Sequence, residues 1–340
     1  MLYIIIVTPI CNLKCKYCGG SLQGMPDEIS YNIEELVKFI GKDREAVVAF
    51  YGGEPLLKAN LVKELIDVLP AKKFVLQTNG FFIEKLSSYI HKLDSILLSI
   101  DGRQQTTDFY RCPSCYNKVM NALQFLKKNG YRGEIIARMA ASIKTDIYED
   151  VMHLLHHFPY VHWQLDVIWS NLWHLEEFKE WAEESYKPGI KKLVKIWIEK
   201  LKENKILGII PFLGIASRIL HGGNGLPCGA GKNAIAITTD GKILACPIAP
   251  DFQWNVLGNF DEWKKIDIGK PCKSCSIYDI CGGRCLFAYK EKLWGNDGFN
   301  EICKITKFTI NEIEKYKDTL MEWKEELRYP PYNNTTEIIP

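Results

Sequence analysis

The residues best suited to chemistry in this sequence are its twelve cysteines. Three lie near the N-terminus, two form an isolated pair, and seven lie in the last third of the chain. A chain of 340 residues, 47% of them hydrophobic, can bury a large core without disulfide staples. No export signal is recognisable at its start, so we expect a cytoplasmic protein. In a reducing compartment, this many thiols should bind metal or take part in redox reactions.

The N-terminal cysteines have the spacing C-x3-C-x2-C. Cys11, Cys15 and Cys18 follow an apolar run at residues 3–8. Three thiolates fill only three of the four tetrahedral positions of zinc, whereas a cubane iron–sulfur cluster on three cysteines leaves one iron open to a non-protein ligand. The spacing therefore favours an iron–sulfur cluster. A zinc loop and thiols that are merely buried are the alternatives.

The elements that must position these cysteines alternate along residues 1–205. Apolar runs predict six parallel strands, and amphipathic stretches predict helices between and after them. This alternation predicts an α/β fold with a parallel sheet, too short for a complete eight-unit barrel. In barrels of this kind the loops after the strands build the active site. The strands are expected at 3–8, 46–50, 73–77, 95–100, 133–139 and 162–168, and the helices at 33–41, 60–69, 83–91, 116–129, 146–157 and 174–204.

The cysteine loop after the first strand resembles the hallmark of the radical S-adenosylmethionine (SAM) superfamily, including the aromatic Tyr17 before its third cysteine. A second family element, Gly52-Gly53-Glu54, follows the strand at 46–50. The resemblance implies a partial (β/α)6 barrel of TIM type, with a SAM-binding [4Fe–4S] cluster on the three cysteines. It also implies that the Gly-Gly-Glu segment hydrogen-bonds the amino group of SAM, since glycines permit a close backbone approach.

Further SAM contacts are expected at the other strand ends. Gln-Thr-Asn-Gly at 77–80 and Ser-Ile-Asp-Gly at 99–102 look like the family's third and fourth strand ends, which implies that Ser99 holds the SAM carboxylate or ribose. Asp101 serves the site or caps a turn. Arg138 binds SAM or substrate, or forms a buried ion pair with Asp166. The expected cofactor-binding residues are Tyr17, Gly52, Gly53, Glu54, Asn79, Ser99, Asp101, Arg138 and Ser142.

The seven cysteines of the last third match the pattern of the SPASM domain, an extension of radical SAM enzymes that mature peptides and proteins. In that family the domain holds two auxiliary [4Fe–4S] clusters. No cysteine stands shortly before Cys228, so the proximal cluster is expected to keep an open iron. A zinc ribbon is the alternative for the distal ligands. The resemblance implies Cys272, Cys275, Cys281 and Cys303 as ligands of the distal cluster, and Cys228, Cys246 and Cys285 as ligands of the proximal one.

The predicted organisation has four parts. A radical SAM partial barrel is expected at 1–205, a linker at 206–227, a SPASM domain at 228–310, and a C-terminal helix and tail at 311–340. Within the SPASM part, residues 236–246 predict a β-hairpin with an Asp-Gly turn. The net charge of +2 gives no reason to expect a nucleic-acid partner. No apolar run approaches the roughly 18 residues of a membrane span.

Together these features predict a radical SAM/SPASM enzyme of oxidoreductase type. The resemblance implies reductive cleavage of SAM to a 5′-deoxyadenosyl radical, which abstracts hydrogen from a ribosomally made peptide or protein. Ferredoxin or flavodoxin is the expected electron donor. An oxidative cross-link is the expected product, and epimerisation is the alternative. Cys112 and Cys115, outside both cysteine patterns, are candidates for a catalytic hydrogen donor or for the missing cluster ligand.

Other functions are weighed against this one. Pro247 stands where sulfatase-maturing relatives carry an aspartate base, which argues against formylglycine formation. Radical SAM maturation of a small molecule, such as a tetrapyrrole precursor, is a second enzymatic interpretation. A non-catalytic zinc or iron–sulfur scaffold protein is the alternative of another class.

Overall fold

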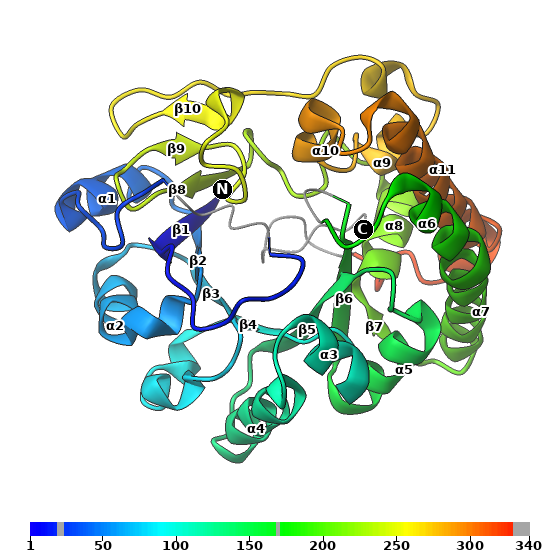
Figure 1. The fold of residues 1–340 in the computed structure, drawn as a ribbon, viewed down its shortest axis with the longest axis horizontal. Helices are drawn as coiled ribbons and strands as arrows, with labels where there is room; N and C mark the ends of the chain where they lie inside the picture. Colours follow the sequence, from blue (N-terminus) through cyan, green and yellow to red (C-terminus); the bar gives the residue numbers. More distant parts are fainter. Residues whose placement is uncertain (19–23, 168–170, 329–340) are drawn as a thin grey trace.

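A single ten-stranded sheet organises the part of the chain that the computed structural model describes, residues 1–18, 24–167 and 171–328. The strand order is β10-β9-β8-β1-β2-β3-β4-β5-β6-β7. All pairings from β8 to β7 are parallel, and only β8–β9 and β9–β10 are antiparallel. The sheet curves so that its helices lie on the outside (Figure 1).

The six expected parallel strands are all present, with helices or turns between them. The last expected strand, at 162–168, ends earlier, and residue 168 lies outside the described residues. The expected helix at 83–91 is instead two short 3-10 turns, Ile83–Leu86 and Ile90–Lys92. The strands are β1 (Leu2–Thr8), β2 (Val47–Gly52), β3 (Lys73–Thr78), β4 (Ser95–Ser99), β5 (Glu134–Ala141) and β6 (Tyr160–Leu165). The helices are α1 (Ile33–Ile40), α2 (Ala59–Val68), α3 (Gln104–Tyr110), α4 (Cys115–Lys128) and α5 (Ile147–His157).

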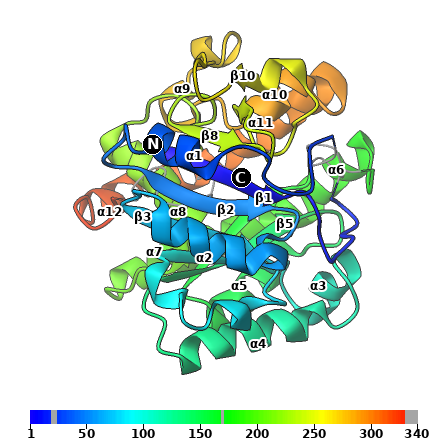
Figure 2. The ribbon, with the colours of Figure 1, turned by 90° about the vertical axis from the view of Figure 1, so that its left-hand side faces the viewer.

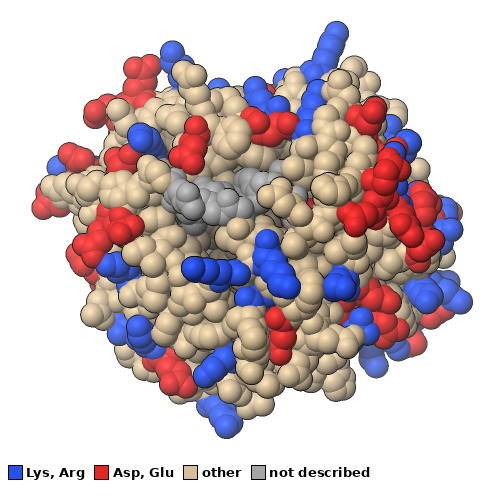
Figure 3. All heavy atoms as spheres, in the orientation of Figure 1, with Lys and Arg blue, Asp and Glu red and all other residues tan. Residues whose placement is uncertain are grey.

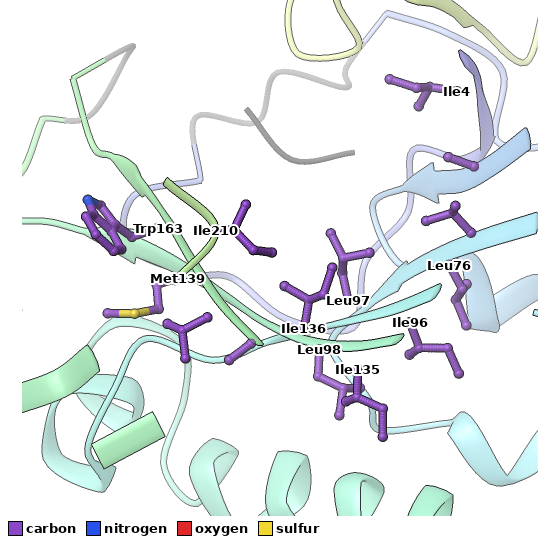
Figure 4. Packing of buried hydrophobic residues seen from close by; sticks show 14 of the residues in the cluster. Ile4, Leu76, Ile96, Leu97, Leu98, Ile135, Ile136, Met139, Trp163 and Ile210 are labelled. Carbon is purple, nitrogen blue, oxygen red and sulfur yellow. The ribbon is translucent and has the colours of Figure 1, made fainter. Parts of the chain in front are cut away.

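The core lies between the strands and their helices. All seven residues of β1 are buried, as expected for a parallel strand whose two faces are both covered. Figure 4 shows apolar side chains of neighbouring strands, among them Leu76, Ile96 and Ile136, packed side by side. This packing fixes where each strand ends, and therefore where the loops after the strands stand.

The segment expected as a linker at 206–227 is structured. It contains β7 (Gly208–Ile209), which pairs with β6, and α8 (Ile210–His221). Most residues of α8 are buried, so the helix is apolar on nearly all sides and lacks the amphipathic period by which a surface helix is recognised. Before it, the expected helix at 174–204 consists of α6 (Leu175–Trp181), a π-helical turn (Ala182–Tyr186) and α7 (Lys187–Lys202).

The C-terminal part continues the barrel sheet. The predicted hairpin is confirmed as β8 (Ala234–Ile237) and β9 (Ile243–Leu244), followed by β10 (Val256–Gly258). Because β8 pairs with β1, the C-terminal part packs directly against the first strand of the barrel (Figure 2). The last helices are α9 (Tyr278–Cys281), α10 (Leu286–Glu291), α11 (Gly295–Glu314) and α12 (Lys317–Met321).

Two boundaries in this part differ from the predicted ones. Helix α11 crosses the expected domain boundary at 310, so the helix expected within 311–340 begins earlier and is divided into α11 and α12. Residues 329–340 of the expected tail lie outside the described residues. Among the described helices, none is both long enough and apolar enough to cross a membrane.

The chain after the cysteine loop is fastened to the β8–β9 hairpin. The Thr239 hydroxyl donates to the carbonyl of Pro26 at 2.6 Å, and the Ser30 amide donates to the carbonyl of Thr239 at 2.8 Å. The Thr8 hydroxyl, at the end of β1, donates to the carbonyl of Asp27 at 2.8 Å. The exit of the cysteine loop is thus held jointly by the barrel and the C-terminal part.

Candidate active site

A cavity of about 230 Å³ opens at the carboxyl ends of the barrel strands, beside the loop that carries Cys11, Cys15 and Cys18. We call it the cysteine-loop cavity. Eight further residues that the sequence singled out line it, and so does Ile248 from the C-terminal part. The described residues that line it are Cys11, Leu13, Cys15, Tyr17, Cys18, Tyr51, Gly52, Gly53, Glu54, Gln77, Thr78, Asn79, Ser99, Arg111, Arg138, Met139, Ala140, Gln164, Leu165, Asp166 and Ile248.

The three loop thiols lie together at this cavity but differ in exposure. Cys11 and Cys18 are exposed, and Cys15 is half-buried. Burial raises the pKa of Cys15 to about 11, although the nearby Arg111 guanidinium opposes the shift. Burial also raises the pKa of Cys11. Without a bound metal, these two side chains are therefore neutral thiols at pH 7, and binding iron must displace their protons.

Glu54 joins two strand ends. Its Oε1 accepts from the Leu56 amide at 2.9 Å and from the Thr78 hydroxyl at 2.7 Å, and its Oε2 accepts from the Asn79 amide at 2.7 Å. The side chain is 1% exposed, and burial raises the pKa of its carboxyl. Asn79 in turn donates to Asn12 Oδ1 in the cysteine loop at 2.8 Å. The two residues thus connect β2 and β3 to the loop.

The two glycines before Glu54 lie against the segment that follows β1. A Cβ at Gly53 would stand 2.2 Å from the carbonyl oxygen of Ile10, and a Cβ at Gly52 would stand 2.3 Å from that of Thr8. Gly52 also has a φ of 145°, which side-chain-bearing residues rarely adopt. The glycines are therefore required by a backbone crossing at the base of the cysteine loop, a constraint that the sequence interpretation assigned to the ligand.

Asp101 and Ser142 do not line the cavity, which corrects their expected role as direct SAM contacts. Asp101 is fully buried and accepts hydrogen bonds from Tyr17, from Arg111 and from the Ala140 amide. Ser142 is fully buried as well, and its amide donates to Thr145 Oγ1 at 3.0 Å. The Asp101 side chain is used inside the protein, so Asp101 can only position residues that do reach the cavity, and Ser142 is kept from the cavity by its burial.

Ser99 and Arg138 form a polar pair on the cavity wall. They are directly opposite in the parallel register of β4 and β5. Arg138 donates to Gln164 Oε1 at 2.8 Å and contacts the ring of His162, so its guanidinium is held in place. A hydroxyl beside a fixed guanidinium suits a carboxylate ligand.

A second, inner cavity adjoins the first. The thiols of Cys228, Cys246 and Cys285, expected as ligands of one auxiliary cluster, line it together with Pro247. Its wall includes five residues that also line the cysteine-loop cavity. These shared residues are Tyr51, Gln77, Arg138, Gln164 and Ile248.

A third cavity, of about 210 Å³, brings together the other four cysteines of the last third. Burial and, after it, the neighbouring thiols raise the pKa of Cys272 to about 12. Cys285 lines both this cavity and the inner one. Among the described residues, no three His, Cys, Asp or Glu side chains meet tightly enough to ligate a single metal ion. The four cysteines of this cavity are Cys272, Cys275, Cys281 and Cys303.

Cys112 and Cys115 are joined to each other by a disulfide at the start of α4. This differs from the expectation of two thiols, one of which donates hydrogen to the substrate or ligates a cluster. Neither residue lines the cysteine-loop cavity or the inner cavity. Because Cys115 is also fully buried, the pair is not in a position to donate hydrogen to a substrate in the cavity or to complete the inner thiol group.

Residues that the sequence interpretation missed complete the cavity wall. Arg111 reaches it from the end of α3, and Tyr51 from the end of β2. Met139 and Ala140 belong to β5, a strand from which only Arg138 was chosen. No motif identifies these residues, although their positions at strand and helix ends on the cavity side offered a signal.

Comparison with known proteins identifies the N-terminal part. The family model described as the Radical SAM superfamily matches residues 5–158. These residues contain the cysteine loop, the Gly-Gly-Glu turn and the strands from β1 to β5. The chain contains a radical SAM domain. SAM and a [4Fe–4S] cluster are the cofactors that this family implies.

A curated relative is similar over a shorter stretch. The probable GTP 3′,8-cyclase of Methanococcus maripaludis is 31% identical over 102 residues, which are 28% of this chain and 34% of the relative. The chain therefore spans about a third of the length of that relative.

Two solved structures share the fold of the radical SAM domain and of the region after it. That of anSMEcpe with bound AdoMet and Cp18Cys peptide has a TM-score of 0.73 and 19% identity, over 96% of this chain and 99% of the other. Streptococcus suis SuiB bound to precursor peptide SuiA has a TM-score of 0.55 and 15% identity, over 84% and 72% of the two chains. This likeness shows the fold, a partial barrel with a C-terminal extension.

The residues at the cysteine-loop cavity fit the implied cofactors. Three thiols on one loop suit a cluster with one open iron, and the Ser99–Arg138 pair suits the carboxylate of SAM. The turn at 52–54 lines the cavity too, and its backbone carbonyls are acceptors of the kind that the SAM amino group would need. The Glu54 carboxylate is already occupied by three donors within the protein.

Proposed function

We propose that this protein is a radical SAM enzyme that oxidatively modifies a peptide or protein. The observation that carries the proposal is that two of the cavities adjoin each other. The cysteine-loop cavity and the inner cavity share five wall residues, so a substrate between them would face the SAM site on one side and the inner thiols on the other.

Each group of residues has its own role in this proposal. Cys11, Cys15 and Cys18 hold the cluster that binds SAM, and Ser99 and Arg138 hold the SAM carboxylate. When bound, these cofactors supply the reductive cleavage of SAM to methionine and a 5′-deoxyadenosyl radical. The cavity walls orient the substrate and exclude water. The inner and distal thiols hold two auxiliary [4Fe–4S] clusters.

The arrangement supports an oxidative cross-link over epimerisation. Epimerisation needs a hydrogen donor at the cavity, and Cys112 and Cys115 do not line it. Oxidation needs an electron acceptor instead, and the inner thiols adjoin the distal ones through Cys285. Pro247, in the inner cavity, has no titratable group and cannot replace the aspartate base of formylglycine-forming relatives.

Two solved structures support a peptide substrate, because anSMEcpe and SuiB are both described with a bound peptide. The second candidate substrate is a nucleotide or another small molecule, favoured by the similarity to the probable GTP 3′,8-cyclase. A peptide proposal expects the substrate to extend out of the open cavity, whereas a small molecule would lie inside it. If the substrate is a peptide, the enzyme should therefore turn it over more slowly when residues remote from the reacting residue are removed.

Iron analysis of anaerobically reconstituted protein tests the proposal. We expect about twelve irons per chain, four for each of three clusters, and formation of 5′-deoxyadenosine from SAM. Replacing the three loop cysteines by alanine should remove about four irons and abolish SAM cleavage. Zinc in place of iron, without absorbance near 400 nm, would support the scaffold alternative and contradict the enzyme proposal.

A further inference from the structure

A basic and aromatic patch covers the outer side of the cysteine loop. Phe109, at the end of α3, is 37% exposed. The ammonium of Lys16 lies 3.6 Å from its ring centroid, and that of Lys144 lies 5.1 Å from it. Lys14, two residues before Lys16, is exposed on the same loop. We call these four residues the loop patch. Figure 3 shows Lys and Arg side chains gathered near the middle of this face of the molecule.

The patch is held in place by Tyr110, which joins its three segments. The carbonyl of Tyr110 accepts from the Lys16 amide at 2.8 Å, and its hydroxyl accepts from the Lys144 amide at 2.8 Å. Tyr110 itself is fully buried. The two lysines that flank Phe109 therefore start from a fixed backbone, and a partner would not have to order these segments on binding.

The positive charge of the patch is not neutralised within the described part of the protein. Neither Lys14, Lys16 nor Lys144 forms an ion pair with a described carboxylate, whereas lysines elsewhere on the surface do, such as Lys200 with Glu203. Exposed cations grouped around an aromatic side chain complement the charge of an acidic partner, and aromatic residues are enriched at protein interfaces.

The patch lies on the side of the loop that faces away from the cavity. Leu13, Cys15 and Tyr17 line the cysteine-loop cavity, while Lys14 and Lys16, which alternate with them, do not. Phe109 and Lys144 do not line it either. A substrate in the cavity is therefore separated from the patch by the loop. A partner on the patch would lie next to the loop that holds the cluster cysteines.

We propose that the loop patch is the docking site of the protein that supplies electrons to the enzyme. This inference rests on the proposed function, which requires one electron for each SAM cleaved. The partner is an acidic one-electron carrier whose redox group is surrounded by carboxylates. In the transfer, a flavin hydroquinone of the carrier is oxidised to the semiquinone, and the cluster held by Cys11, Cys15 and Cys18 is reduced by the same electron.

The test compares binding of an acidic flavodoxin to the reconstituted parent and to the double variant Lys16→Glu/Lys144→Glu by titration calorimetry. We expect the parent complex to weaken as salt is raised, and the variant to bind about tenfold more weakly or worse at low salt. Lys128→Glu is the matched control, since Lys128 is exposed at the far end of α4 and should bind like the parent. Phe109→Ala should also weaken binding without changing the net charge.

Measuring the rate of SAM cleavage with two different reductants distinguishes a docking role of the loop patch from a role in cluster or substrate binding. With dithionite as reductant, the double variant should form 5′-deoxyadenosine at the parent rate, and with reduced flavodoxin about tenfold more slowly. Equal flavodoxin binding by parent and variant, or a parent that does not bind it, would overturn the proposal. So would a dithionite-driven rate that falls equally, or a raised KM for the substrate. A parent without SAM cleavage under dithionite would instead contradict the proposed function, while the binding comparison still decides the docking site.

Discussion

The hydroxyl of Tyr17 donates to Oδ2 of Asp101 at 2.7 Å, across 84 residues of sequence. Tyr17 stands between two cysteines of the loop, and Asp101 follows β4. Arg111 closes the group, since its guanidinium binds both carboxylate oxygens of Asp101 at 2.8 Å and lies 5.6 Å from the Tyr17 ring centroid. The position of the cysteine loop is therefore set by a buried charge pair outside the cysteine motif.

Replacing Tyr17 by Phe removes one donor and keeps the ring. Burial raises the pKa of the Tyr17 hydroxyl, so at neutral pH it is protonated and donates. Losing a hydrogen bond to a carboxylate should lower the free energy of unfolding by about 1.5–3 kcal/mol. Because Asp101 keeps Arg111 and the Ala140 amide, we expect the iron content to stay at the parent value while SAM binding weakens.

Urea unfolding, iron analysis and the change in the electron paramagnetic resonance signal on adding SAM are the measurements. Tyr89→Phe is the matched control, since Tyr89 also donates to an aspartate, Asp67, but on the surface. A Tyr17→Phe protein with parent stability and a parent SAM response would show that the pair does not position the loop.

Replacing Gly53 by Ala should disturb the cluster and SAM binding together. The added Cβ would meet the carbonyl oxygens of Ile10 at 2.2 Å and Pro9 at 2.5 Å, at the base of the cysteine loop. The backbone must shift there, so we expect a loss of about four irons along with SAM cleavage. Gly130→Ala is the control: no atom lies within 4 Å of a Cβ at that position, and its φ of 67° should lower stability while iron content and SAM cleavage stay at the parent values. Full iron content with lost SAM binding would indicate that a glycine is required at position 53 to leave room for SAM, and not for the backbone of the cysteine loop.

Replacing Glu54 by Gln puts an amide nitrogen where an oxygen accepts from an N–H or O–H group. The three donors to Glu54 come from Leu56, Thr78 and Asn79, so at least one of them loses its acceptor. An unsatisfied buried donor costs about 1–3 kcal/mol, and the urea midpoint should fall accordingly. Glu28→Gln is the control: it breaks an exposed ion pair with Lys58 and should leave the urea midpoint almost unchanged. Equal effects of the two substitutions would refute the bridging role of Glu54.

The strands could be predicted from the sequence because parallel strands are buried on both faces. Each strand is therefore a continuous run of apolar residues. Helix α8 was not predicted for a related reason. It is apolar on almost every side, so its sequence shows no amphipathic period. The segment was therefore taken for a linker. The cysteines of the last third could be assigned to two groups because they match the family's pattern, and the structure places each group along a cavity.

The roles of individual site residues were harder to predict than their location. The Gly-Gly-Glu segment does line the cavity. Its two glycines are required because a Cβ there would clash with the carbonyls of Thr8 and Ile10, and its carboxylate accepts hydrogen bonds within the protein. A sequence motif indicates that a certain residue type is required at a position, but it does not indicate which contact in the structure requires it. Arg111 had no motif at all, because its position depends on how the end of α3 meets the cysteine loop.

Replacing both Cys112 and Cys115 by Ala tests whether the pair has any part in catalysis. The disulfide closes only a short loop, so its loss should lower the free energy of unfolding by about 2 kcal/mol at most. Iron content, SAM cleavage and product should equal those of the parent, because neither residue lines the cysteine-loop cavity or the inner cavity. The parent treated with a thiol reductant is the control and should show the same small loss of stability. A loss of about four irons would make the pair cluster ligands. Lost product with normal SAM cleavage would restore the role of hydrogen donor, and with it epimerisation as the reaction.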